Sequence, residues 1–305
     1  MKLGQLGQLN DKALSNWKTG RPLNTKQVME APPFVGLVDC TIEAPDPVSS
    51  VMLLVNTDDM VAAKFFYCGS YEKTSLTIWA VLSRLSDVIF DIGSHTGIYS
   101  LTAAAANPSA QIISFEPVPQ NAYRQRMNLR ANRYKNVKVI EAACCTKTEQ
   151  VKMNIPDLGS YLTSGASLSN QSGNSGLSSV QGVCIDQSVK ISGKLDLVKI
   201  DAEGGEVEVL TGMARTIEVN RPFVLFECVD KQICEPVTRF FFERGYKLFE
   251  IDDINGKVVG TERLVVHTQG DGKPDMSRLN RVAVHETNLG TLSAELDFLH
   301  FELSL

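Results

Sequence analysis

The sequence predicts an α/β fold built on a doubly wound, mostly parallel β-sheet. Two observations support this prediction. From residue 88 onward, short apolar and β-prone runs alternate with segments of helical periodicity. Four of these runs end in an acidic residue, which is costly in a core unless something pairs with it. Because parallel neighbours need long connections, the intervening segments should be helices that cover both faces of the sheet.

The expected elements follow one another from residue 58. Two helices separated at Gly69 are expected within residues 58–85. Strands are then expected at residues 88–92, 111–115, 137–142, 195–200, 223–226 and 246–251, with helices at 97–106, 119–132 and 205–217 and another ending near residue 244. One final antiparallel strand is expected at the sheet edge, from residues 264–267 or 298–301.

Two regions depart from this alternation. Residues 1–57 contain five prolines and two short β-like runs, at 34–42 and 51–55, and predict an N-terminal extension packed on a main domain at 58–305. Residues 159–179 are dominated by serine and glycine without periodicity. This composition favours a flexible surface loop. The alternative is a mobile lid over an active site.

Composition narrows the function. A formal charge of −5 and a pI near 5.5 argue against a phosphate-backbone partner, so no nucleic acid is expected. The seven cysteines are odd in number and form no C-x-x-C pair, which favours reduced thiols over a disulfide frame or a zinc site. The first residues lack a secretory signal, and no run of roughly 18 apolar residues occurs. The expectation is a cytoplasmic protein that does not act at a membrane.

The four acids at the strand ends, Asp91, Glu116, Asp201 and Glu227, predict a shared binding crevice. In a doubly wound sheet, the carboxyl ends of the parallel strands lie at one edge, and ligands bind there. Glu116 lies 19 residues after Gly97, close to the spacing at which an acid accepts hydrogen bonds from the ribose of a nucleotide. This spacing predicts a cofactor that carries a nucleoside.

The loop after the first strand discriminates between two cofactor classes. A dinucleotide loop needs G-x-G-x-x-G, so that bare backbone can approach a pyrophosphate. Starting from Gly93, the second and third glycine positions hold His95 and Ile98, so a nicotinamide-dependent oxidoreductase is the weaker alternative. The D-x-G-x-x-x-G pattern from Asp91 to Gly97 instead suits a cofactor without phosphate, such as S-adenosylmethionine.

Five blocks of the sequence carry a family resemblance: YCGSYE, FDIGSHTGIYSL, FEPVPQNAYRQRMNLRAN, VKVIEAA and, most specific, LDLVKIDAEGGEVEVLTGM. They resemble the FkbM-type S-adenosylmethionine-dependent methyltransferases over about residues 67–230. The resemblance implies a Rossmann-like class I methyltransferase fold. It also implies methyl transfer to an acceptor, expected to be a hydroxyl of a sugar or small metabolite. The implied partner is a small-molecule or glycan acceptor, and a homo-oligomer is left open.

The resemblance also implies a set of cofactor-binding residues, which are Glu72, Asp91, Gly93, Ser94, Gly97, Glu116, Ala142, Ala143 and Asp201. Glu116 would hold the ribose, Ala142 and Ala143 would lie near the adenine, and Asp201 near the methionine end. His95 departs from the family, which more often has Asn there. Two alternatives stay open: Gly97 could serve only close helix–strand packing, and Glu72 could be an acid at a helix N-terminus.

The catalytic candidates are Glu203, Glu227 and His95, with Asp201 as a further acid. A hydroxyl acceptor must lose its proton, so a general base should lie within hydrogen-bond reach of it. Glu203 is the first choice because it follows a strand end at the start of a helix, although it could instead cap that helix. The carboxylates could also bind a divalent ion, but the prediction includes no metal. A non-catalytic cofactor-binding module is the remaining alternative.

Overall fold

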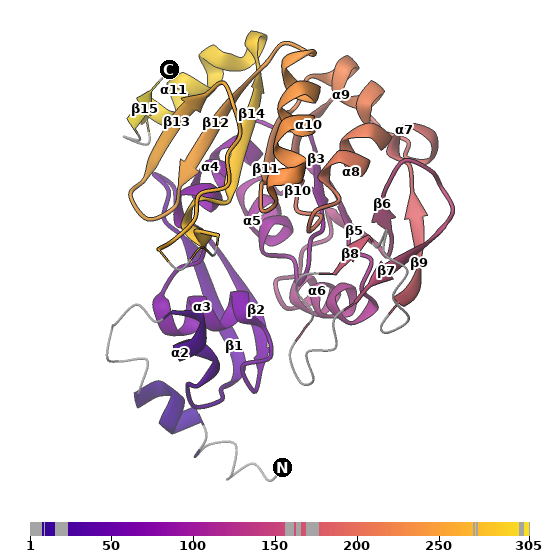
Figure 1. The fold of residues 1–305 in the computed structure, drawn as a ribbon. Helices are drawn as coiled ribbons and strands as arrows, with labels where there is room; N and C mark the ends of the chain where they lie inside the picture. Colours follow the sequence, from indigo (N-terminus) through magenta and orange to yellow (C-terminus); the bar gives the residue numbers. More distant parts are fainter. Residues whose placement is uncertain are drawn as a thin grey trace.

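The computed structural model describes residues 8, 10–15, 24–155, 162, 166–168, 177–270, 272, 274–298 and 302–304. Nine of the described strands form one large sheet, and two smaller sheets lie beside it (Figure 1). The strand order of the large sheet is β15-β13-β12-β14-β11-β10-β3-β4-β5. The α/β fold with a large, mostly parallel sheet is therefore confirmed.

Five neighbouring parallel strands make up one half of the large sheet. They are β3 (Val88–Ile92), β4 (Gln111–Phe115), β5 (Val137–Ile140), β10 (Leu195–Ile200) and β11 (Phe223–Glu227). The chain builds outward from β3 to β5 and then returns to place β10 on the other side of β3. Such a reversal opens a crevice at the carboxyl ends of the two central strands, where a ligand can bind.

One antiparallel strand lies inside the sheet. It is β14 (Asn280–His285), which pairs antiparallel with both β11 and β12 (Tyr246–Asp252). Two more strands, β13 (Lys257–Thr261) and β15 (Glu302–Ser304), extend the sheet beyond β12. The strands β14, β13 and β15 all run antiparallel to β11, and β15 lies at the edge, so an antiparallel edge strand is present as expected. Residues 264–267 do not form a strand. Residues 299–301 lie outside the described part of the chain. All six residues of β14 are buried, including Arg281, as expected for a strand that has a neighbour on each side.

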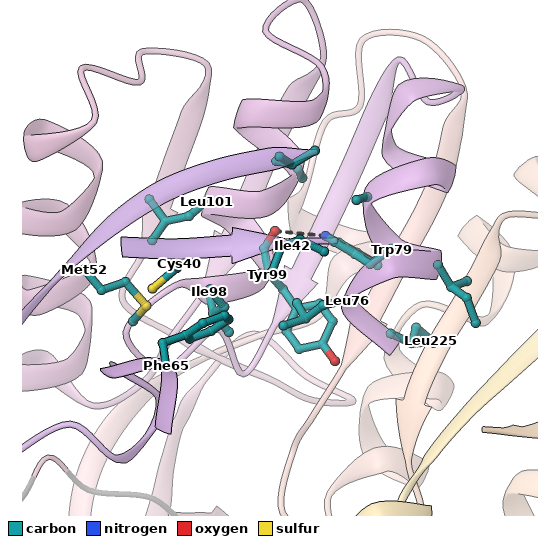
Figure 2. Close-up of a cluster of buried hydrophobic side chains, with 14 of the residues drawn as sticks. Cys40, Ile42, Met52, Phe65, Leu76, Trp79, Ile98, Tyr99, Leu101 and Leu225 are labelled. Atoms are coloured by element: carbon teal, nitrogen blue, oxygen red, sulfur yellow. Dashed lines mark hydrogen bonds between the residues drawn. The ribbon is translucent and has the colours of Figure 1, made fainter. Parts of the chain in front are cut away.

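Helices cover both faces of the sheet. On one face lie α8 (Glu206–Gly212), α9 (Ala214–Asn220) and α10 (Lys231–Phe242), and their apolar residues share a core with β3, β10 and β11. The single helix expected at 205–217 is in fact α8 and α9, which meet at Met213. On the other face lie α4 (Lys73–Arg84), α5 (Ile98–Ala106) and α11 (Leu289–Phe298). Figure 2 shows part of this second core, where the Trp79 indole donates a 2.9 Å hydrogen bond to the backbone oxygen of Tyr99.

A hairpin precedes the large sheet in the chain. It consists of β1 (Val35–Ile42) and β2 (Val48–Val55) and lies with α2 (Thr25–Met29) and α3 (Met60–Cys68) at the lower left of Figure 1. Helix α6 (Pro119–Ala131) reaches it from the main sheet. The backbone amide of Leu53 donates to Asn128 Oδ1 at 2.8 Å, and that of Val51 donates to Asn132 Oδ1 at 2.8 Å. These bonds satisfy amides of β2 that have no strand partner. The domain boundary at residue 57 stays a prediction.

A small sheet lies next to the carboxyl end of β5. Its order is β6 (Ala143–Cys144), β9 (Leu177–Val183), β7 (Gln150–Asn154) and β8 (Ser167–Leu168), and α7 (Ile185–Ser188) follows β9. Most of the serine- and glycine-rich insert at 159–179 lies outside the described residues, so its role as loop or lid stays a prediction. In the described parts of the chain, every helix is too short or too polar to cross a membrane.

Candidate active site

A cavity of about 870 Å³ opens at the carboxyl ends of β3, β4, β10 and β11. Every residue that the sequence predicts as part of the site lines it: Glu72, Asp91, Gly93, Ser94, His95, Gly97, Glu116, Ala142, Ala143, Asp201, Glu203 and Glu227. The structure therefore brings the four strand-end acids to one place. The individual roles of these residues stay predictions.

The two glycines of the β3–α5 loop are required by close packing as well as by backbone conformation. Gly93 and Gly97 have φ values of 77° and 98°, which residues with a Cβ rarely adopt. A Cβ on Gly93 would lie 1.7 Å from the backbone oxygen of Asp201, and one on Gly97 would lie 2.5 Å from Cγ of Gln125. The space beside Gly93 is filled by the neighbouring turn. Both positions therefore need glycine to let the loop lie close to its neighbours.

Asp91 is fixed beneath this loop. It is 1 % exposed and accepts a 2.6 Å hydrogen bond from Ser100 Oγ of α5. Burial raises the pKa of Asp91 to about 6, although the Ser100 bond and the charge of Lys199 act in the other direction. Gln125 of α6 lies nearby, accepting from Ser94 Oγ at 2.9 Å and donating to Ser100 Oγ at 3.1 Å. The loop, β3 and α6 are thus joined by buried polar contacts.

Glu116 already receives hydrogen bonds from the protein. Its Oε2 accepts from the His95 amide at 2.8 Å, and its Oε1 accepts from the Val118 amide at 2.9 Å and from Asn121 Nδ2 at 3.4 Å. Burial raises its pKa, and these donors partly offset that effect. A carboxylate oxygen has more than one lone pair. Glu116 can therefore orient the loop and still accept a hydrogen bond from a ribose hydroxyl.

His95 has an unusual environment. Its φ of 49° places it in the left-handed region, which a non-glycine residue enters at an energetic cost. Its Nδ1 lies 3.3 Å from Thr96 Oγ1, whereas its Nε2 is buried and has no hydrogen-bond partner among the residues described. A polar group of a bound ligand could form the hydrogen bond that this buried nitrogen of the cavity wall lacks.

A second wall forms where α4 begins, and Glu72 lies at its centre. Glu72 has a φ of 39°, and it accepts a hydrogen bond from the Tyr99 hydroxyl. Asp253, which follows β12, accepts from the Ser75 amide at 2.8 Å and from Ser75 Oγ at 2.9 Å. It therefore caps α4, so Glu72 is not the residue that satisfies the amides of this helix. Sequence reasoning missed Tyr99 and Asp253 as site residues.

The turn after β10 is held by Glu206, not by Glu203. Glu206 Oε1 accepts from the amides of Ala202 and Gly204, at 3.1 and 3.3 Å. Gly205 is the N-cap of α8 and has no side-chain cap. Glu203 is exposed at the cavity rim with a φ of 50°. The alternative that Glu203 caps this helix is thus less favoured than a role at the rim.

Glu227 and Lys199 lie deeper in the cavity. Glu227 ends β11 and is 9 % exposed, and burial followed by the negative charge of Asp201 raises its pKa well above the ordinary value. Lys199, in β10, is 1 % exposed and places its Nζ 3.6 Å from Asp201 Oδ2. Sequence reasoning did not assign Lys199. The signal was available, because residues two apart on a strand point to the same side, as Lys199 and Asp201 do.

These residues fit S-adenosylmethionine. The cofactor carries a sulfonium and an ammonium, and four carboxylates line the cavity around a single buried lysine: Glu72, Asp91, Asp201 and Glu227. An excess of negative charge favours a cationic ligand. Among the described residues, Nε2 of His95 has no partner and could bond to a polar group of the cofactor, and Glu116 is predicted to accept from the ribose hydroxyls.

Comparison with known proteins identifies the family of this chain. Residues 91–248, more than half of the chain, match the methyltransferase FkbM domain. Among solved structures, FkbM methyltransferase from Methylobacillus flagellatus KT is 16 % identical, with a TM-score of 0.44 over 65 % of this chain and 43 % of that one. Precorrin-6y C5,15-methyltransferase from Geobacter metallireducens GS-15 is 14 % identical, with a TM-score of 0.41 over 70 % and 87 %. No curated protein matches. The chain belongs to the FkbM family of methyltransferases, and its cofactor is S-adenosylmethionine.

Proposed function

We propose that this methyltransferase methylates a hydroxyl oxygen of a neutral, polyhydroxylated acceptor, a sugar or a small metabolite. The observation that carries the proposal is the cluster of carboxylates in the cavity, Glu72, Asp201 and Glu227, which share one buried lysine. An anionic acceptor would be repelled by this cluster. An amine would be held as an ammonium, because nearby carboxylates raise its pKa, and an ammonium has no lone pair to donate. A hydroxyl is neutral and can donate its proton to a carboxylate.

The far side of the cavity supports a polyhydroxylated acceptor. Beyond the predicted cofactor residues, its wall includes Asp253, Gln269, Asp275 and Ser277. These side chains offer several hydrogen-bond donors and acceptors but no cation. Asp253 and Asp275 already accept hydrogen bonds within the protein, and their remaining lone pairs can accept from the hydroxyl groups of a ligand.

Little covalent help is required from the protein. S-adenosylmethionine, when bound, supplies a methyl group that is already activated by its sulfonium. Glu116 would accept hydrogen bonds from the ribose, and the β3–α5 loop would position the rest of the cofactor. The chain contributes chiefly by orienting the acceptor and excluding water.

Glu227 is the proton acceptor that the geometry favours. It is buried at the end of a central strand and lines the cavity, whereas Glu203 is exposed at the rim. A general base works best when its pKa is near the operating pH, and burial together with Asp201 shifts the pKa of Glu227 upward from the acidic range. Glu203 and His95 remain the alternatives.

The test compares Glu227→Gln with the matched variant Glu203→Gln. Both variants and the full-length wild-type protein are assayed for S-adenosylhomocysteine release with a panel of neutral sugars, polyols and primary amines. We expect turnover of hydroxyl acceptors alone. Glu227→Gln should lower the chemical step by about 10²–10⁴-fold, the usual contribution of a general base. Glu203→Gln should have a much smaller effect.

Calorimetry with S-adenosylhomocysteine provides the control for this test. The affinity should be nearly unchanged in both variants, since the amides keep the shape of the acids they replace. Methylation of amines alone would refute the oxygen acceptor. A large loss of turnover confined to Glu203→Gln would transfer the role of base to Glu203.

A further inference from the structure

Lys199 is buried in the interior of the site but is used by none of the roles assigned above. It lies near the end of β10, between β3 and β11, in register with Asp91. Its Nζ lies 3.2 Å from Asn280 Oδ1, 3.6 Å from Asp201 Oδ2 and 5.1 Å from the ring centroid of Tyr99. These three groups come from β14, from the turn after β10 and from α5. The ammonium is therefore held in one position from three sides.

Acids from four separate segments face this ammonium. They are Asp91 in β3, Asp201 after β10, Glu227 at the end of β11 and Glu72 before α4. Three further charged or titratable groups interact with these acids. His95 acts on Asp201, Glu203 acts on Glu227, and Asp253 interacts with Glu72. Lys199 is the only cation with a fully buried side chain among the described residues of the cavity wall. It is thus a counter-ion common to several acids, not the partner of one.

The charge of Lys199 is preserved by its surroundings. Burial lowers the pKa of Lys199, but Asp201 and the three other acids more than offset this effect, so its pKa is raised above the ordinary value. The ammonium in turn lowers the pKa values of Asp91, Asp201 and Glu227 against the effect of burial. Without this ammonium, the same acids would be desolvated like charges and would take up protons.

We propose that Lys199 is the positioning residue that keeps Asp201 and Glu227 ionised, so that Glu227 can accept the proton of the acceptor hydroxyl. This inference rests on the proposed function, because it assigns Lys199 to the general base of the same site. Lys199 does not itself accept the proton. It acts through the two acids, and its effect should therefore appear in their titration.

The test is a pH titration of the full-length protein by NMR with ¹³C-labelled Asp and Glu carboxyl groups. The signals of Asp201 and Glu227 are identified with Asp201→Asn and Glu227→Gln. In Lys199→Met, we expect the midpoint of Asp201 to rise by about one to three pH units, the effect of losing an opposite charge at this distance. The midpoint of Glu227 should also rise. Unchanged midpoints for both acids would overturn the proposal.

Two comparisons separate charge from structure. Lys194→Met removes an exposed lysine that lies 3.3 Å from Asp196 and does not line the cavity, and it should leave both midpoints unchanged. Lys199→Arg keeps the positive charge, and its midpoints should lie closer to those of the wild type than the midpoints of Lys199→Met do. A Lys199→Arg titration equal to that of Lys199→Met would show that charge is not the cause.

Lys199→Met could fail to fold, because removing one member of a buried ion pair is strongly destabilising. The wild-type protein then supplies the decisive measurement, ¹⁵N NMR of the Lys199 ammonium. The proposal expects Nζ to lose its proton only above the pH at which an ordinary lysine loses it. Loss of its proton near neutrality would overturn the proposal. None of these titrations needs methyl transfer, so failure of the oxygen-acceptor proposal in the acceptor screen would be seen independently.

Discussion

Glu206 begins α8, and its side chain has no exposure to solvent. One carboxylate oxygen holds the turn after β10, and the other has no hydrogen-bond partner in the described part of the chain. Burial raises its pKa from 4.5 to about 7, with the backbone amides acting in the opposite direction. Between pH 4.5 and about 7, Glu206 therefore stays protonated in the folded protein, whereas the unfolded chain has released this proton. Stability from this group is present below pH 4.5 and is lost as the pH rises through about 7.

Glu206→Gln should remove this pH dependence. A rise in pKa from 4.5 to about 7 corresponds to about 3 kcal/mol of unfolding free energy, lost by the wild type across that interval. The glutamine cannot ionise, so the variant should gain stability relative to the wild type as the pH increases from 5 to 8. Urea unfolding at several pH values measures the difference. Glu208→Gln, at a half-exposed position of the same helix, is the control. Parallel stability profiles for Glu206→Gln and the wild type would contradict the explanation.

At the scale of elements, the contact between Asp253 and Ser75 joins the end of β12 to the first turn of α4. The two residues are 178 positions apart in the chain. Because Glu72 immediately precedes α4, this cap also fixes the wall of the cavity that carries Glu72. Burial raises the pKa of Asp253 to about 6, with the charge of Glu72 adding to the effect and the Ser75 bonds opposing it.

Asp253→Ala should lower both stability and cofactor affinity. Loss of a helix cap costs about 1 kcal/mol, and α4 would then be free to displace Glu72. Asp230→Ala is a matched control, since Asp230 caps α10 by accepting from the Gln232 amide at 2.8 Å and does not line the cavity. Thermal unfolding should show similar losses for the two variants. Calorimetry with S-adenosylhomocysteine should show weaker binding for Asp253→Ala alone, and equal affinities would mean that the cap does not affect the site.

The parallel strands were predictable because each is a short β-prone run in regular alternation with helical segments, and four of the five runs end in an acid. β14 was not, because its sequence, NRVAVH, has a charged residue at its second position. Arg281 is nevertheless 0 % exposed. Its guanidinium donates to the backbone oxygen of Val265 at 2.8 Å and lies 3.7 Å from Glu250 Oε1. These partners belong to distant segments, so nothing local in the sequence indicates that this arginine can be buried.

The same limit applies to the site. Alternation and spacing identified the residues at the strand ends, because their positions follow from the sheet alone. Tyr99 and Asp253 reach the cavity, and Asn280 reaches Lys199, only through the packing of α4, α5 and β14 on that sheet. The packing functions of Gly93 and Gly97 likewise depend on neighbours that are distant in sequence, the turn at Asp201 and Gln125 of α6.

At the scale of the whole molecule, β14 joins the parallel half of the sheet to β12, β13 and β15. A chain that ends at residue 272 would lack β14 and leave β11 and β12 unpaired along one edge each. We expect it to aggregate or to lose cooperative unfolding, because unpaired interior edges are not protected. A chain that ends at residue 298 loses only β15, which pairs with β13 alone. It should retain a thermal transition and S-adenosylhomocysteine binding. Similar behaviour of the two truncated proteins would show that β14 does not unite the sheet.

The place of β14 also has a consequence for how the protein is made. On the ribosome, β11 and β12 are synthesised first, and the strand that lies between them emerges later. A nascent chain at that stage has two exposed strand edges, a state that is prone to misassembly. Asn280, the partner of Lys199, arrives with the same late strand. The site is therefore completed only when β14 has been synthesised. A nascent chain that ends before this strand lacks Asn280, so it cannot form the hydrogen bond that Lys199 makes in the finished protein.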